Sequence, residues 1–232
     1  MTDTANPAAR DAAVLWTGGK DSALALHEAR QLGWNVRCLV TFAPPEPDFL
    51  AHPVAVMKLQ AEALGLPHWL WPVHAPFEER YEAGLRWLQK TQRIDTVITG
   101  DIAEVGGAPN WIRERSRPLG MNVLTPLWGR DRLTLLQQLL EARFAVVFSC
   151  IKTRWLTPEW VGRQLDETSV SQLRALRERN GIDLCGEEGE YHTLVTDAPG
   201  FRQRVHFGAA QVCERDALAY LKIESAELRP KP

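Results

Sequence analysis

The sequence lacks several patterns that mark common classes of protein. Its 27 Lys and Arg residues do not outnumber its 29 Asp and Glu residues, so the positive excess that attracts bulk RNA or DNA is missing and we expect no nucleic-acid partner. No C-x-x-C pair is present, which removes support for zinc ribbons, iron–sulfur clusters and thioredoxin-type redox sites. The four unpaired cysteines are Cys38, Cys150, Cys185 and Cys213.

Long apolar segments are also missing. The N-terminal stretch MTDTANPAARDAA has no apolar core of the kind that a signal peptide needs. The longest apolar run, FAVVFSCI at 144–151, is too short to span a bilayer and reads as a buried strand. We therefore expect no membrane partner and, because scattered single cysteines suit a reducing compartment, a cytoplasmic location.

The sequence does contain a regular alternation of apolar, strand-like segments and helix-like segments. This pattern favours an α/β fold with a doubly wound, mostly parallel sheet, a Rossmann-like α/β/α sandwich whose ligands bind at the carboxyl ends of the strands. Strands are expected over 12–16, 34–42, 68–73, 95–101, 122–128 and 144–151, and helices over 22–32, 54–65, 77–91 and 133–142.

The pattern changes after residue 152. Two helices are expected over 156–167 and 169–181, followed by a turn-rich, acidic and then strand-like tail. We expect this part to form a small C-terminal α+β portion packed over the ligand edge of the sheet. The sequence thus divides into a disordered tail at 1–11, a sheet domain at 12–152 and a C-terminal portion at 153–232.

The stretch TGGKDS at 17–22 links the first expected strand to the first expected helix. Gly18 and Gly19 let the backbone approach an anion closely. The N–H groups at the start of a helix point towards such an anion, and the helix dipole adds to the attraction. Lys20 supplies a positive charge, so the loop favours a phosphate site over a simple glycine turn with a surface lysine.

Other phosphate-binding loops do not fit this stretch. A Walker A loop needs glycine where Val14 stands, and Ser or Thr directly after the lysine, where Asp21 stands. A G-x-G-x-x-G fingerprint is absent. Ser22 can donate its hydroxyl or cap the helix, and Asp21 can cap it or help to hold magnesium.

TGGKDS resembles the SGGKDS loop of the PP-loop (N-type) ATP pyrophosphatases, in the adenine nucleotide alpha hydrolase superfamily. Thr17 replaces the first serine and keeps its hydroxyl. The resemblance implies that ATP is cleaved between its α- and β-phosphates, that AMP passes to a substrate oxygen and that pyrophosphate leaves. The residues it implies for nucleotide binding are Thr17, Gly18, Gly19, Lys20, Asp21 and Ser22.

A second stretch, CGEEGEYHTLVTDAPGF at 185–201, puts Glu187 and Glu190 three residues apart. Paired carboxylates can bind a cation, hold ammonium or accept a proton, whereas a solvated acidic turn is the alternative. The pattern is similar to a signature of the diphthine–ammonia ligase family. GDI at 100–102 followed by PLWGRD at 126–131 matches that family's middle segment in the same order, so the resemblance covers about residues 12–201.

The family implies an amide-forming ligase in which ATP activates a carboxylate, ammonia attacks, and AMP and pyrophosphate leave. Its known substrate is the diphthine residue of translation elongation factor 2. The resemblance gives Lys20 the task of stabilising the leaving pyrophosphate, with magnesium neutralising the triphosphate. It places Glu187 and Glu190 beside the substrate or ammonia, and Gly100 and Asp101 near the nucleotide.

Two departures limit what carries over. The tyrosine–glutamine–arginine segment of eukaryotic and archaeal members is missing from residues 103–121, and His192 stands where those members have an acidic residue. The EYHT form is similar to short bacterial relatives. We expect the ATP chemistry, with a carboxylate other than diphthine and with ammonia or another amine as acceptor; a PP-loop tRNA-modifying enzyme and a nucleotide sensor without turnover are the alternatives.

Several other residues have both a functional and a structural interpretation. His192 is a general base or a structural side chain, and Cys150 and Cys185 are reactive thiols or small core residues. The nine tryptophans are core residues or leave room for a homodimer interface. The stretch WIRERSR contains Arg113, Arg115 and Arg117. One interpretation is that these arginines clamp an anion, and the other is that they belong to an exposed charged helix.

Overall fold

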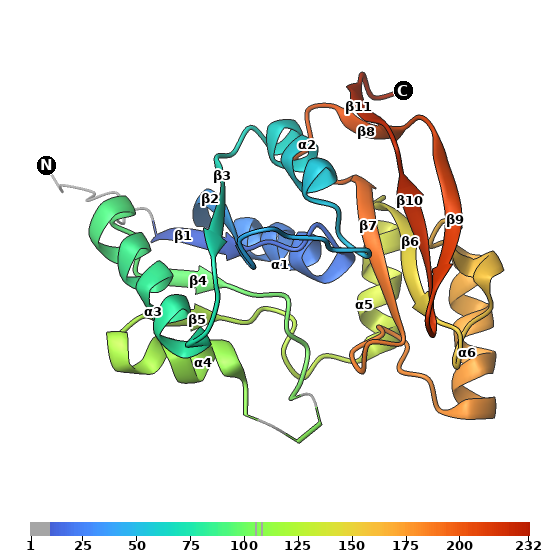
Figure 1. Cartoon of the computed structure of the whole chain (residues 1–232), viewed down its shortest axis with the longest axis horizontal. Coiled ribbons are helices and arrows are strands. Elements are labelled where there is room, and N and C mark those ends of the chain that lie inside the picture. Colours follow the sequence, from blue (N-terminus) through green and yellow to red (C-terminus); the bar gives the residue numbers. More distant parts are fainter. Residues whose placement is uncertain (1–9, 105, 108) are drawn as a thin grey trace, which may run out of the picture.

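A five-stranded parallel sheet forms the first half of the chain. The computed structural model describes residues 10–104, 106–107 and 109–232 (Figure 1). The strand order is β3-β2-β1-β4-β5, and every neighbouring pair is parallel. The strands are β1 (Arg10–Leu15), β2 (Trp34–Ala43), β3 (His68–Pro72), β4 (Thr96–Ile98) and β5 (Asn122–Leu124). The Rossmann-like core expected from the sequence is therefore confirmed.

Helices cover both faces of this sheet, as the alternating side chains of β1 show. Ala12 and Val14 pack into the cluster that contains α1 and α2, whereas Ala13 packs into the cluster that contains α3. Successive residues of a strand point to opposite faces, so one strand serves both layers. The helices are α1 (Lys20–Gln31), α2 (Val54–Leu64), α3 (Phe77–Trp87), continued by a π-helical turn (Leu88–Gln92), and α4 (Trp111–Ser116), continued by a 3-10 turn (Arg117–Leu119).

A second, antiparallel sheet of order β7-β6-β10-β9 forms most of the C-terminal half, beside the first sheet in Figure 1. A two-stranded ribbon and two helices complete this half. The strands are β6 (Ala145–Lys152), β7 (Tyr191–Asp197), β8 (Arg204–Phe207), β9 (Ala210–Arg215), β10 (Leu218–Ile223) and β11 (Ala226–Arg229), and the helices are α5 (Arg132–Glu141) and α6 (Glu167–Asn180), with a 3-10 turn at Pro158–Trp160.

The strand expected at 144–151 exists, but its expected place in the parallel sheet is wrong. β6 lies between β7 and β10 and pairs antiparallel with both. Six consecutive residues, 146–151, are buried. A continuous apolar run indicates burial on both faces and does not distinguish a parallel strand from the central strand of an antiparallel sheet. The division of the chain at residue 152 stays a prediction.

Two further expectations need correction. The helix expected over 156–167 is only a 3-10 turn, because Gly162 adopts a positive φ of 87° and Leu165 then donates its N–H to the carbonyl of Val146 in β6. The tail expected at 1–11 is too long, since Arg10 and Asp11 pair with β2. The remainder of that tail, 1–9, lies outside the described residues.

One hydrophobic cluster joins the two halves. It contains Val14 of β1, Leu24 of α1 and Met57 of α2 together with Phe148 of β6 and Leu194 of β7. The carboxyl end of the parallel sheet is therefore held firmly against the antiparallel sheet. Over the described part of the chain, no helix combines the length and the apolar character needed to cross a bilayer.

Candidate active site

A cavity of about 550 Å³ opens at the carboxyl ends of β1, β2 and β4, the edge where parallel sheets bind ligands. Its walls come from both halves of the chain, because the acidic segment (183–190) and the start of β7 close the side that faces the glycine loop (17–22). The predicted site residues that line it are Thr17, Gly19, Lys20, Asp21, Ser22, Gly100, Asp101 and Glu187. Of the predicted set, Gly18 and Glu190 do not line it.

Both glycines of the loop lie close to neighbouring groups, and Gly18 has the stronger requirement for glycine. Gly18 has a positive φ of 78°, and a Cβ atom there would collide with Oε1 of Gln60. A Cβ atom on Gly19 would lie 3.2 Å from the carbonyl oxygen of Thr193 and 3.2 Å from Cε1 of His52. The loop is thus packed from α2, from β7 and from the proline-rich loop (44–53) that links β2 to α2, which leaves its cavity side for a ligand.

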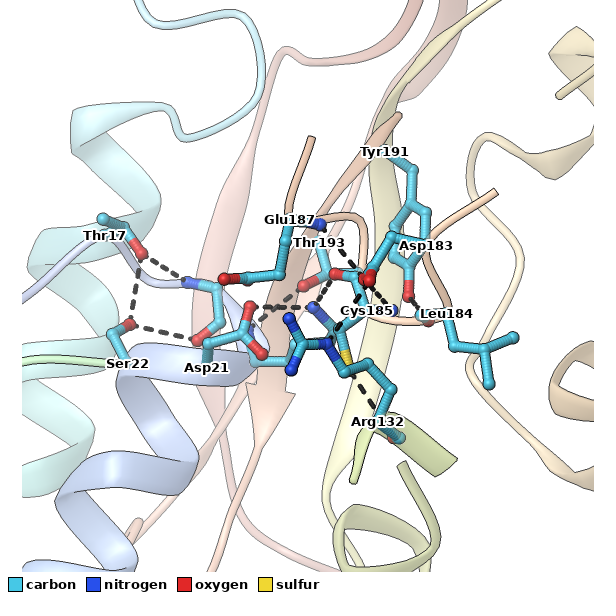
Figure 2. Close-up of polar contacts among 12 residues, drawn as sticks. Thr17, Asp21, Ser22, Arg132, Asp183, Leu184, Cys185, Glu187, Tyr191 and Thr193 are labelled. Atoms are coloured by element: carbon cyan, nitrogen blue, oxygen red, sulfur yellow. Dashed lines mark hydrogen bonds and ion pairs between the residues drawn. The ribbon is translucent and has the colours of Figure 1, made fainter. Parts of the chain in front are cut away.

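The start of α1 faces the cavity without a cap from its own N-cap residue, since that residue is Gly19. The Lys20 N–H donates to Oγ1 of Thr193 at 3.1 Å. The hydroxyls of Thr17 and Ser22 lie 3.2 Å apart, and Ser22 also donates to the Gly19 carbonyl (Figure 2). A helix N-terminus ringed by hydroxyls in this way suits a phosphate group.

Lys20 reaches from the loop to the acidic segment. Its side chain is buried, and Nζ donates to Oδ2 of Asp21 at 2.7 Å and to the carbonyl oxygen of Cys185 at 2.5 Å. Nζ also lies 5.2 Å from the centre of the Tyr191 ring. Burial is the largest influence and lowers the pKa of Lys20, but the attractions of Asp21, Tyr191 and Cys185 together outweigh it and raise the pKa above its usual value. The ammonium therefore stays charged.

The acidic segment, 183–190, is folded by the carboxylate of Asp183. This carboxylate accepts the N–H of Cys185 at 2.8 Å and the N–H of Glu187 at 3.3 Å, and Nε of Arg132 lies 3.3 Å from its other oxygen. Figure 2 shows Glu187 between Asp183 and the glycine loop. Asp183 and Arg132 thus position Glu187 at the cavity.

The two predicted carboxylates, Glu187 and Glu190, have different surroundings in the structure. Glu187 lines the cavity, and burial, followed by the nearby charge of Asp21 and opposed by Lys20, raises its pKa to about 7. Glu190 is 2% exposed, and its Oε1 accepts the N–H of Asp183 at 2.9 Å. Glu187 is therefore poised to exchange a proton near neutral pH, whereas Glu190 holds the backbone of the acidic segment.

Gly100 and Asp101 follow β4 and also line the cavity. Oδ2 of Asp101 accepts from the side-chain amide of Asn110 at 2.6 Å. A Cβ atom on Gly100 would lie 2.5 Å from the carbonyl carbon of Asp21. Gly100 therefore allows the first turn of α1 to lie directly against the end of the parallel sheet.

Three contributions to the site were missed by the sequence analysis. Gln60 is fully buried and bonds the glycine loop; a single glutamine on the apolar face of α2 was its signal. Phe42 and Tyr81 stack with ring centres 3.9 Å apart at the apolar wall of the cavity. Asp183 had no signal, because it looks like any other acidic residue next to the motif.

The described residues do not form a metal site by themselves, but carboxylates at the cavity could bind a metal ion together with a nucleotide. Among the described residues, no three His, Cys, Asp or Glu side chains cluster in a way that could hold a metal ion. Asp21, Asp101 and Glu187 each bring a carboxylate to the cavity wall. Magnesium commonly uses one or two carboxylates together with substrate phosphates, so these residues fit a magnesium ion that arrives with a nucleotide.

The arginines and most of the tryptophans weighed above have structural surroundings. Arg113 lies 4.5 Å over the Trp128 ring and donates to Thr125, and Arg115 pairs with Glu82. Neither arginine lines the cavity, to which α4 contributes Ile112. The tryptophans divide between the core and the surface: Trp16 and Trp160 are buried, and Trp69 and Trp111 are exposed.

Comparison with known proteins points to one family. A model of the diphthamide synthase N-terminal domain matches residues 10–123, and a model of the C-terminal domain matches residues 131–228. The diphthine–ammonia ligase of Schizosaccharomyces pombe is 26% identical over 94% of this chain, and that of Bos taurus is 24% identical over 94%. This chain spans 39% of the yeast protein and 92% of the bovine one.

One solved structure is a weaker neighbour. It is described as a predicted subunit of tRNA methyltransferase from Methanocaldococcus jannaschii, is 18% identical and covers 81% of this chain and 97% of its own, with a TM-score of 0.45. That score is too low to bear on function. The two family models together match nearly the whole described chain and meet between the parallel sheet and α5. The chain belongs to the diphthamide synthase family.

Proposed function

We propose that this chain is an ATP-dependent ligase that adenylates a carboxylate and amidates it with ammonia or another amine, releasing AMP and pyrophosphate. One observation carries the proposal: the glycine loop with its charged Lys20 and the titratable Glu187 come from opposite halves of the chain and line one cavity. The names of the diphthine–ammonia ligases to which the chain is similar support it.

The cavity has distinct regions for the parts of such a reaction. The uncapped start of α1 would receive the β- and γ-phosphates. The apolar wall formed by Phe42, Tyr81 and Ile112 would receive the adenine ring. The part of the cavity lined by Glu187 would receive the carboxylate substrate, either a small molecule or a protein side chain, and ammonia.

The first step would form the acyl adenylate. A carboxylate oxygen attacks the α-phosphorus, and the bond from this phosphorus to the bridging oxygen of the β-phosphate breaks, so that pyrophosphate leaves. Lys20 and the N–H groups at the start of α1 would stabilise the charge that grows on pyrophosphate. Magnesium would neutralise part of the triphosphate charge when bound, and Asp21 and Asp101 are the residues that would hold it.

The second step would form the amide. Ammonia attacks the acyl carbon, the bond from that carbon to the AMP oxygen breaks, and AMP leaves. The attacking nitrogen must lose a proton, and Glu187 is the group at the cavity wall whose pKa, about 7, suits it to accept that proton. Asp183 and Arg132 would keep Glu187 aimed at the acceptor.

Replacing Glu187 by glutamine tests this step. Wild-type turnover should rise with pH through about 7, as the carboxylate loses its proton. The variant should lose this dependence and turn over about 10²- to 10⁴-fold more slowly. Glu188→Gln, at an exposed neighbour, is the control and should keep the wild-type profile. A Glu187→Gln profile identical to that of the wild type would remove Glu187 from the mechanism.

The same variant has a second readout in stability. The pKa of Glu187 is about 7 in the folded chain, above its ordinary value of 4.5. The unfolded chain therefore loses this proton first, and the group lowers the free energy of unfolding as pH rises from 4.5 to about 7. Glu187→Gln should abolish that part of the pH dependence, measured by urea denaturation at several pH values.

The proposed function itself is tested with ¹⁵N-labelled ammonium. The protein, ATP and magnesium are incubated with pools of carboxylates and with protein fractions, and products are searched by mass spectrometry for a carboxylate oxygen replaced by ¹⁵N. Labelled amide that depends on ATP supports the ligase. ATP that binds and stays intact with every pool and fraction would favour a nucleotide sensor.

A further inference from the structure

Two histidines meet beside the glycine loop. His52 comes from the proline-rich loop that precedes α2, and His192 comes from β7. Their ring centres lie 5.4 Å apart, with the rings nearly perpendicular. Both side chains line the cavity. The amide ligase chemistry described above uses neither of them.

The imidazole of His52 lies directly against the glycine loop. Its Cε1 is 3.2 Å from the position that a Cβ atom on Gly19 would occupy. Its Nδ1 is buried and has no hydrogen-bond partner among the described residues. Nitrogen atoms without partners are costly to bury, so this arrangement suits a group that arrives with a ligand.

The surroundings of the pair favour an anion as that ligand. The charged groups that act on the two rings are Lys20 on α1 and, for His192, also Lys152 on β6. Two histidines alone do not make a metal site, and the described residues offer no third ligand to complete one. Neighbouring cations repel a metal ion and attract a phosphate.

We propose that His52 and His192 form a proton-linked clamp for the β- and γ-phosphates of a nucleoside triphosphate and for the pyrophosphate that leaves. This inference rests on the proposed function, because it assigns the polyphosphate to the same loop. The two rings of the clamp come from the proline-rich loop and from β7 and meet beside the glycine loop. It takes up protons when the polyphosphate binds and gives them back when pyrophosphate leaves.

The electrostatics give the sign of the effect. Burial, then His192 and Lys20, lower the pKa of His52 to about 3. The side chain of His192 keeps an exposed part, but the surrounding protein, then Lys20 and Lys152, lower its pKa in the same direction, to about 4. Both rings are therefore neutral at pH 7 in the free protein. A bound polyanion favours the charged imidazoles and raises both pKa values, so binding should strengthen as pH falls.

The test is calorimetric binding of pyrophosphate, α,β-methylene ATP and AMP at pH 6 and pH 8, each in two buffers of different ionisation enthalpy. The wild type should take up about one proton more than the His52→Asn/His192→Asn double variant when either polyphosphate binds at pH 6. The double variant should bind about tenfold more weakly at pH 6 and almost normally at pH 8. Comparing the two proteins cancels protons taken up by the ligand itself.

The controls separate the clamp from the proposed function. His74→Asn, at an exposed histidine outside the cavity, should behave as the wild type. The clamp would be overturned, and the ligase would stand, if the wild type and the double variant took up equal numbers of protons. The same holds if the wild type took up as many protons with AMP as with the polyphosphates. A wild type that binds neither polyphosphate would overturn both.

A measurement on the wild type alone guards against a double variant that fails to fold. With ¹³C-labelled histidine, pyrophosphate should move the titration of two of the six histidine Cε1–H signals to higher pH. Unchanged titration of all six signals in the presence of saturating pyrophosphate would overturn the clamp as well.

Discussion

Replacing Lys20 by methionine should lower AMP formation by about 100- to 1,000-fold, the loss expected when a preorganised charge next to a leaving group is removed. The ammonium is buried and charged, and it is held by Asp21 and by the Cys185 carbonyl at the wall where pyrophosphate would depart. Methionine is an unbranched side chain only one atom shorter than lysine, so the core around it changes little. The measurement is the initial rate of AMP release with saturating magnesium and ATP.

Stability separates a catalytic Lys20 from a structural one. The side chain of Asp21 is 29% exposed, so the carboxylate that loses its partner remains in contact with water. We expect the free energy of unfolding of Lys20→Met to fall far less than its rate does. Lys222→Met, at an exposed lysine on β10, is the matched control and should leave both quantities unchanged. A rate that falls only in proportion to the folded fraction would make Lys20 a structural residue.

Replacing Gln60 by leucine should cost about 2–4 kcal/mol of folding free energy, because it leaves several buried polar groups without a partner. Oε1 of Gln60 accepts from Nε1 of Trp16 at 3.1 Å, and Nε2 donates to the carbonyls of Gly18 at 2.9 Å and Val195 at 2.7 Å. One amide thus ties together the end of β1, the glycine loop and β7.

The effect of Gln60→Leu should reach the site as well as the fold. The carbonyl of Gly18 also accepts the N–H of Val195, so the loop keeps one tie to β7 and does not detach. We expect weaker binding of pyrophosphate together with a lower urea midpoint. Gln89→Leu, which removes a single hydrogen bond to Leu119 far from the loop, should cost less than about 1 kcal/mol. Equal costs for the two variants would contradict the special position of Gln60.

The parallel sheet and the glycine loop were predictable from the sequence because each depends on local signals. Apolar strands alternate with helices, and the two glycines precede a lysine at a strand–helix junction. A glycine pair in that setting indicates a phosphate site on physical grounds alone. The structure confirms the sheet and brings Thr17, Gly19, Lys20 and Ser22 to one cavity.

The rest of the site depends on contacts between residues far apart in the chain. Whether Glu187 or Glu190 faces the cavity is decided by Asp183, whose carboxylate accepts two N–H groups of its own turn and meets Arg132 from the start of α5. Spacing within the motif carries no information about this choice. The sheet to which β6 belongs is set in the same way, by its pairing with β7 and β10.

The bond that is broken in ATP tests the central claim most directly. ³¹P NMR of ATP and magnesium with the protein, ammonium and the carboxylate pools or protein fractions distinguishes the products. The glycine loop, Lys20 and Glu187 predict AMP and pyrophosphate in equal amounts, formed only when a carboxylate is present. Release of ADP and phosphate instead would show cleavage between the β- and γ-phosphates and would contradict the account.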